Sequence, residues 1–326
     1  MYYESYKKKP TKKRRARRSF GGWIAHFLLK LLSLALVFLI VGAGILYALP
    51  VSLFCIEPEG QDLSLTDGLP SSRINVLLLG MDVLNDNSQR SDTIIIASIG
   101  YQTLKLTSVL RDTVVDIPGH GSGKINAAFS YGGPELVMKT LNSNFDLNIM
   151  HYIAVDFTSL VTLVDAIGGV EIDISEAEME QINRNVYNSR RVFLPLGYTA
   201  TELTQYGEGV HLDGLQALGY ARIRKIDSDF MRASRQRTLL NAMIKKLRSN
   251  IWNPLMLYRL TDALLNAVQT NMSFIQLVSL GEKALLAGEP GQMRMPVDNT
   301  YTDNGSTIKI DDRQANIDAF RRFVYE

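Results

Sequence analysis

Three short charged sequences each adjoin an apolar run, and together they supply acids and guanidinium groups at the ends of predicted strands. The charged residues are Asp82 in LLLGMD, Arg90 and Asp92 in RSDT, and Arg111 and Asp112 in SVLRDT. Carboxylate oxygens bind Mg²⁺ and guanidinium groups bind phosphate oxygens, so the combination is suited to phosphoryl transfer. An isolated aspartate in such a place often only caps a turn. Three such sequences in succession favour a functional site over three separate caps.

A fourth segment, YARIRKIDSDFMRASRQR, carries a denser group of cations. Arg222 and Arg224 alternate, so an extended backbone would place both on one face. Arg232, Arg235 and Gln236 have the spacing that places side chains on one face of a helix. This group of guanidiniums matches a highly charged anion such as a pyrophosphate. The alternative is a solvated basic helix whose arginines pair with the two aspartates of the same segment.

Other catalytic chemistries find little support. The four histidines (His26, His120, His151 and His211) lack the spacing of metal ligands. The chain contains neither a G-x-S-x-G sequence nor a P-loop. Cys55 is the only cysteine, so no intrachain disulfide can form.

The elements that must position these residues alternate between apolar strands and helices. Strands are predicted over residues 74–80, 93–100, 105–110, 151–157 and 170–174. Helices are predicted over 134–144, 159–169, 212–220, 230–247, 254–268, 273–287 and 313–325, and residues 175–210 are predicted to form a long polar excursion. The alternation indicates an α/β fold, with a central mixed β-sheet flanked by helices in three α-β-α layers.

The N-terminal region differs from the rest in charge and hydropathy. Residues 31–49 carry no charge and as a helix would span about 28 Å, against a hydrocarbon core of about 30 Å. A cleaved signal peptide would have a shorter apolar region. The first 20 residues carry a net charge of +8, which leaves −6 for the other 306 because the whole chain carries +2. By the positive-inside rule the N-terminus is cytoplasmic.

We therefore predict four regions in a single-pass protein of the cell membrane. They are a basic cytoplasmic tail (1–23), a transmembrane helix (24–49), a linker (50–72) and an extracytoplasmic domain (73–326). Next to a membrane span, a basic tail is a topology signal that contacts anionic lipid, so we expect no nucleic-acid partner.

Seven blocks of the chain resemble, in order, those of the LytR-CpsA-Psr family. The blocks are LLLGMD, RSDT, SVLRDT, GKINAAFSYGGPE, VDFTSLVTLVDAIGGVEIDI, HLDGLQALGYARIR and DFMRASRQR. The resemblance runs from about residue 73 to the C-terminus and is most specific over 74–247. One departure is Leu110, where the family often has proline before the arginine. A proline there would shape the backbone without contacting phosphate.

The resemblance implies a ligase of Gram-positive cell-wall assembly. Such an enzyme takes a glycopolymer (teichoic acid, capsule or a similar polysaccharide) from a polyprenyl-pyrophosphate carrier and joins it to peptidoglycan through a phosphodiester. Matched by motif, Asp82 and Asp92 would hold Mg²⁺ and would act with Arg111 in catalysis. The pyrophosphate would be bound by Arg90, Arg111, Arg222, Arg224, Arg232, Arg235 and Gln236. The apolar strands and the LVDAIGG helix would line a pocket for the prenyl chain.

Two other classes of protein are alternatives. One is a membrane-tethered module that binds polyprenyl pyrophosphate and regulates the envelope or transcription without catalysis; the full set of carboxylates and arginines argues against it. The other is a DNA-binding transcriptional regulator, and a 20-residue tail without a helix-turn-helix pattern argues against it.

Overall fold

The computed structural model describes residues 62–82, 90–224, 226 and 229–326, apart from the side chains of Asp82 and Asp229. In this part of the chain no helix is long and apolar enough to cross a membrane. The predicted tail, transmembrane helix and most of the linker lie outside the described residues.

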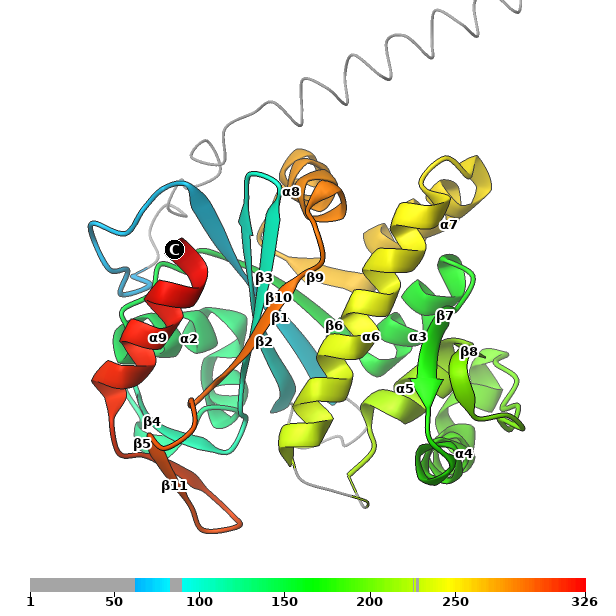
Figure 1. The fold of residues 1–326 in the computed structure, drawn as a ribbon, viewed down its shortest axis with the longest axis horizontal. Coiled ribbons are helices and arrows are strands. Elements are labelled where there is room, and N and C mark those ends of the chain that lie inside the picture. Colours follow the sequence, from blue (N-terminus) through cyan, green and yellow to red (C-terminus); the bar gives the residue numbers. More distant parts are fainter. Residues whose placement is uncertain (1–61, 83–89, 225, 227–228) are drawn as a thin grey trace, which may run out of the picture. The chain divides into compact units, whose positions relative to one another are not determined.

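A six-stranded mixed sheet with the order β10-β3-β2-β1-β6-β9 forms the centre of the fold (Figure 1). Its strands are β1 (Arg73–Asp82), β2 (Arg90–Gly100), β3 (Thr103–Val109), β6 (His151–Asp156), β9 (Val268–Thr270) and β10 (Gly291–Met295). β2 runs antiparallel to both β1 and β3, whereas β6 is parallel to β1 and β10 is parallel to β3. The four predicted strands that begin at 74, 93, 105 and 151 are confirmed as members of one mixed sheet.

Helices cover both faces of this sheet, as predicted. They are α2 (Ala127–Phe145), α3 (Phe157–Ala166), α4 (Glu176–Phe193), α5 (Gly214–Ala221), α6 (Asp229–Asn250), α7 (Pro254–Ala267), α8 (Phe274–Leu286) and α9 (Arg313–Tyr325). Successive strand residues point to opposite faces. Leu77 and Leu79 therefore pack on the side of α2 and α9, and Val76 and Leu78 on the side of α6 and α8. Burial of a side chain such as Leu77 stabilises the fold by about 1.5–3 kcal/mol.

α2 is kinked near its start. Gly132 and Gly133 have non-helical dihedral angles, and Gly133 has a φ of +63°, which favours glycine. Pro134 follows directly and begins the regular part of the helix, where proline fits a first turn. The predicted helix over 134–144 is confirmed, and an additional turn precedes it.

The region predicted as a polar excursion, 175–210, contains the 18-residue helix α4, so that prediction is wrong. Ser175 and Glu178 form a capping box at its start. Ile182 and Val186 are buried in a cluster with α3, α5 and β7 (Val170–Ile174). The many charges of the exposed face concealed the S-x-x-E start and the narrow apolar stripe.

Two smaller sheets complete the fold, and one of them supports the charged edge of the central sheet. Its strands are β4 (Thr113–Ile117), β5 (Gly121–Lys124), β11 (Tyr301–Asp303) and β12 (Ile308–Ile310), in the order β11-β12-β4-β5. The other sheet pairs β7 with β8 (Gly207–Leu212). Because β4 begins directly after Asp112, and β5 ends at Lys124, the four-stranded sheet positions both side chains.

Candidate active site

The strand directions bring the first three charged sequences together at one end of the strands of the central sheet, the charged edge. Because β2 is antiparallel to both neighbours, the end of β1, the start of β2 and the end of β3 lie together, with Asp82 opposite Arg90. The register shifts between Gly80 and Met81. A Cβ atom on Gly80 would lie 2.9 Å from the Cβ and Oγ1 of Thr93, so the close approach of β1 and β2 requires glycine there.

Asp92 joins two arginines that are far apart in the sequence. Its Oδ1 accepts a hydrogen bond from Nη1 of Arg111 at 2.7 Å, and its Oδ2 accepts one from Nη2 of Arg224 at 2.5 Å. The Asp92 side chain is only 15% exposed, while that of Arg224 is 47% exposed. The carboxylate is therefore an inner group, and Arg224 is at the solvent side.

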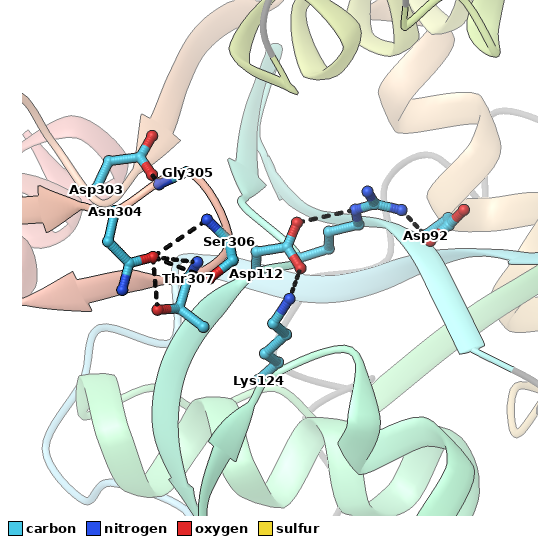
Figure 2. A network of polar contacts seen from close by, with 9 residues as sticks. Asp92, Asp112, Lys124, Asp303, Asn304, Gly305, Ser306 and Thr307 are labelled. Atoms are coloured by element: carbon cyan, nitrogen blue, oxygen red, sulfur yellow. Dashed lines mark hydrogen bonds and ion pairs between the residues drawn. The ribbon is translucent and has the colours of Figure 1, made fainter.

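A line of alternating charges continues from Asp92 toward the four-stranded sheet. Nε of Arg111 donates to Oδ2 of Asp112 at 3.2 Å, and Nζ of Lys124 donates to Oδ1 of the same carboxylate at 2.8 Å. Figure 2 shows Asp112 between Lys124 on one side and, on the other, the arginine that also pairs with Asp92. The guanidinium of Arg111 is thus oriented by two carboxylates before any ligand binds.

The charges around Asp92 set its protonation state. Burial raises the pKa of the carboxyl, but the Arg111 charge and hydrogen bond, with the charges of Arg224 and Arg232, outweigh burial and hold the pKa below its ordinary value of 3.8. Asp92 is therefore an anion at neutral pH, and it offsets part of the positive charge at this edge.

Arg222 does not lie in an extended segment, so the backbone conformation expected for Arg222 and Arg224 is wrong. Arg222 is the C-cap residue of α5, with φ −96° and ψ 5°. Its guanidinium lies 4.7 Å from the ring centroid of Phe157, and its Nη1 donates to Oγ of Ser189 at 3.3 Å. Arg222 and Arg224 nevertheless line one cavity, because the chain turns after α5.

The three predicted residues of α6 divide between two environments. Arg232 and Gln236, four residues apart, line the space beside Asp92. Arg235 points to α4 instead, where its Nε donates to Oε1 of Glu178 at 2.8 Å and its side chain is 5% exposed. The prediction of one shared face is therefore wrong for Arg235. Its acidic partner comes from the helix that the sequence analysis missed.

A cavity of about 270 Å³ extends from this charged edge between the sheet and the helices α3, α5 and α6. Its charged end contains Asp92, Asp156, Arg222, Arg224, Arg232 and Gln236. The rest of its wall is apolar and includes Leu78, Ile95, Ile153, Phe157, Leu160, Leu218, Leu239, Leu240 and Met243. Along α6 the lining residues run from Arg232 to Met243, roughly 16 Å at 1.5 Å per residue. The predicted apolar strands and the helix around LVDAIGG do line a pocket.

Asp82 and Asp92 are the carboxylates at this edge that the sequence singled out as ligands for a magnesium ion. Among the described side chains, no three His, Cys, Asp or Glu residues gather as metal ligands. The backbone places Asp82 at the end of β1, beside the start of β2. Each Asp92 oxygen accepts one of the two hydrogen bonds above and has a second acceptor position. Mg²⁺ typically uses one or two carboxylates and completes its shell with phosphates and water.

Several residues of the site were not singled out from the sequence. Lys124 lies inside the block GKINAAFSYGGPE, so the family resemblance offered a signal for this residue. Asp156 ends β6 and caps α3 through a hydrogen bond from the Ser159 amide at 2.7 Å. Glu178 had a signal in its S-x-x-E spacing. The α6 side chains Leu239 and Met243 had none, because helical periodicity does not distinguish a cavity wall from a core.

Comparisons with known proteins agree with this architecture. The model of the LytR_cpsA_psr family matches residues 59–319. The chain is 30% identical over 267 residues to the regulatory protein MsrR of Staphylococcus aureus (strain COL), covering 78% of this chain and 75% of that protein. It is 29% identical over 259 residues to the polyisoprenyl-teichoic acid–peptidoglycan teichoic acid transferase TagT of Bacillus subtilis (strain 168), covering 73% and 74%.

Solved structures share the fold. The crystal structure of Bacillus subtilis TagT superposes with a TM-score of 0.61 at 24% identity, covering 82% of this chain and 98% of that one. A structure of TagT bound to LI-WTA gives a TM-score of 0.62 at 24% identity, covering 82% and 97%. With a family match that spans most of its length, the chain belongs to the LytR_cpsA_psr family.

Proposed function

We propose that this protein is a phosphotransferase that moves a glycopolymer from a polyprenyl-pyrophosphate carrier to peptidoglycan through a phosphodiester. The observation that carries the proposal is a cavity with an apolar wall and one charged end, where Asp92, Arg224 and Arg232 lie. A lipid-linked pyrophosphate has the same two parts in the same order. The similarity to TagT, which is named as a teichoic acid transferase, supports the reaction class.

The apolar wall is suited to a prenyl chain. It combines side chains of the sheet, such as Leu78 and Ile153, with side chains of α3 and α6, such as Leu160 and Met243. Each methylene or methyl group that such a chain buries contributes about 0.8 kcal/mol. The wall therefore supplies affinity without requiring a particular pattern of hydrogen bonds from the ligand.

The charged end is suited to the pyrophosphate. Asp92 holds Arg224, which lines the cavity. It also holds Arg111, which lines a smaller pocket that shares Asp92 with the cavity. Arg222 is held by Phe157 and Ser189, so these guanidiniums are oriented in advance. Preorganised cations stabilise charge that develops during transfer, because no reorganisation is needed at the moment of reaction. Arg90 lies exposed at the same edge. We assign Arg235 to holding α4 through Glu178.

The proposed transfer is an in-line displacement. The acceptor hydroxyl of peptidoglycan loses its proton to solvent, and its oxygen forms a bond to the phosphorus that carries the glycopolymer. The bond from that phosphorus to the bridging oxygen breaks, and prenyl phosphate leaves. Because Arg111 donates to one oxygen of Asp112 and Lys124 to the other, we assign Asp112 to positioning Arg111.

Asp82 and Asp92 are the residues that we expect to hold Mg²⁺. When bound there, the ion would neutralise charge on the pyrophosphate oxygens. We further propose the topology given by the sequence: a cytoplasmic tail, one membrane span and this domain outside the cell membrane, where a prenyl-linked donor and peptidoglycan are both accessible.

The proposal is tested by Arg111→Ala in the purified full-length chain. With a prenyl-pyrophosphate-linked glycan, a peptidoglycan fragment and Mg²⁺, we expect transfer to fall about 10²–10³-fold. Arg313→Ala is the matched control, because Arg313 forms an exposed ion pair with Asp116 at 3.5 Å. Circular dichroism of both variants checks the fold. Full transfer activity in Arg111→Ala would refute the assignment of Arg111.

A second function has one observation in its favour, since the relative MsrR is named a regulatory protein. A regulator that only binds the lipid pyrophosphate would use the same cavity without turnover. The two functions differ in one measurement on the wild-type chain. Binding of the donor with no glycan transferred to peptidoglycan would favour the regulator.

A further inference from the structure

An apolar surface outside the cavity is left uncovered by the described part of the chain. Among the described residues, nine of the 17 exposed large hydrophobic side chains fall between Trp252 and Leu286. Six of these exposed side chains form the α7–α8 surface: Trp252, Leu255, Tyr258, Phe274, Ile275 and Leu286. α7 illustrates the exposure, since its only buried residues are Met256 and Ala263. Such a concentration differs from the single hydrophobic residues that are scattered over most protein surfaces.

The chain enters the domain at the start of β6, on the edge of the sheet opposite Asp92. Nδ2 of Asn142 donates to the carbonyl oxygens of Leu63 and Ile149, at 2.9 and 3.0 Å. The amide of Thr66 donates to the carbonyl oxygen of Leu147 at 3.0 Å. These bonds attach the first described residues to the turn that precedes β6.

Helix α8 lies at this same edge. Before its start, the Asn271 side chain donates to the carbonyl oxygen of Met150 at 2.8 Å and accepts from the amide of Tyr152 at 3.1 Å, at the beginning of β6. After its end, the Gly288 amide donates to the carbonyl oxygen of Gln102 at 3.4 Å, in the β2–β3 turn. Both ends of α8 are therefore held on the side where the chain enters.

The start of α7 is tied to α8 through the end of α6. The guanidinium of Arg248, in the last turn of α6, donates to the carbonyl oxygens of Ala284, Leu285 and Gly288 at 3.2, 2.6 and 3.0 Å. Trp252 follows only four residues later. Figure 1 shows α7 and α8 at the same upper end of the domain, away from the α4 and β11 labels at the lower end.

We propose that the α7–α8 surface docks on the surface of a lipid bilayer. The predicted span ends at Leu49, and the 12 residues 50–61 reach at most about 40 Å when fully extended, so the entry edge stays within that distance of the end of the span. Trp252 and Tyr258 are the side-chain types that favour the membrane–water interface. Leu255, Phe274 and Ile275 supply the apolar contact that enters the headgroup region.

The orientation of α6 relates this docking surface to the cavity. The first turns of α6 lie at the charged end of the cavity, and Arg248 in its last turn contacts the end of α8. With the α7–α8 surface on the bilayer, the apolar wall of the cavity leads from the lipid side to the arginines. The inference rests on the exposed side chains, the entry edge and the proposed membrane span, and it does not require the proposed transfer reaction.

The test uses the full-length chain in phosphatidylcholine–phosphatidylglycerol vesicles, with Cys55→Ser and one new cysteine labelled with an environment-sensitive fluorophore. The labelled positions are Leu255→Cys, Ile275→Cys and the control Tyr187→Cys. Tyr187 lies on α4 and is 61% exposed, against 56% and 60% for the other two. Lipid-attached nitroxides should quench Leu255→Cys and Ile275→Cys at least about twofold more than the control.

Equal quenching at all three positions would overturn the proposal. Protection of Leu255→Cys and Ile275→Cys from aqueous iodide without quenching by the lipid nitroxide would also overturn it, because a protein partner would then cover the surface. Neither result depends on transfer activity, so the depth measurement stands apart from the test of Arg111.

Discussion

Asp92→Asn keeps the shape of the side chain at the centre of the charged edge and removes its charge. The pair with Arg111 is the more costly to lose, because the two side chains are only 15% and 19% exposed. Removal of one partner from a fully buried pair costs about 3–5 kcal/mol. The pair with Arg224 is screened, since Arg224 is 47% exposed, and contributes about 0–1 kcal/mol. Asparagine retains an acceptor, so we expect a net loss of about 1–3 kcal/mol at pH 7.

The same variant has a defined pH dependence. The pKa of Asp92 is lowered in the folded protein, despite burial, by Arg111, Arg224 and Arg232. A lowered carboxyl pKa contributes stability that is fully present above the unfolded pKa near 3.9 and is lost as the pH falls through the folded value. The stability difference between wild type and Asp92→Asn should therefore be constant near neutrality and shrink below about pH 4.

Thermal unfolding of the full-length chain in detergent measures both effects. For a domain of this size, 1 kcal/mol shifts Tm by about 2–4 °C, so we expect Asp92→Asn to lower Tm by about 2–12 °C at pH 7. Asp116→Asn is the control, because Asp116 is 73% exposed and should change stability by about 0.5 kcal/mol or less. An unchanged Tm at pH 7, or a deficit that persists undiminished at pH 3, would refute this account of the charges.

Two further predictions separate the cavity from its scaffold. Met243→Trp should fill part of the space beside the apolar wall and weaken binding of a prenyl pyrophosphate about tenfold or more, while Tm changes little. Titration with the lipid measures the affinity. Unchanged affinity would show that Met243 is not part of the wall that binds the lipid. Glu178→Leu removes the carboxylate from the buried Arg235 and breaks the α4 capping box, which should lower Tm by about 5 °C or more. Steady-state kinetics should show an unchanged KM for the donor. A raised KM would indicate that Arg235 contributes to binding the phosphate.

Four strands of the central sheet, β1, β2, β3 and β6, could be predicted because their sequences are largely apolar. The other two, β9 (VQT) and β10 (GQMRM), have no such signal and were missed. TIIIASIG is buried on both faces, and such runs have few structural alternatives. α4 was missed because its buried residues, among them Ile182 and Val186, form a stripe within a strongly charged stretch. The short strands β5 and β12 were missed for another reason. GSGK and IKI have almost no local signal, and pairing with β4 creates them as strands.

For the site, sequence reasoning identified the residue types but not their partners. Asp92, Arg111 and Arg224 were each singled out, and antiparallel pairing together with the turn after α5 brings them into contact. The spacing of Arg232 and Arg235 indicated one helix face. A helix face spans a wide arc, however, and Glu178 of α4 draws Arg235 to one side of that arc. Such partners depend on tertiary packing, which spacing along a single helix cannot determine.

The length of α6 connects the proposed reaction with the proposed docking. Arg232 contributes to the charged end, and Arg248 binds the end of α8, so the two levels are separated by roughly 24 Å along the helix. With α8 at the lipid surface, a prenyl pyrophosphate reaches the arginines only if its chain leaves the bilayer over that distance. Each exposed methylene would cost about 0.8 kcal/mol in water. The apolar wall from Leu239 to Met243 offsets this cost, so a hydrophobic cavity beside the arginines is what a bilayer-docked enzyme of this geometry requires.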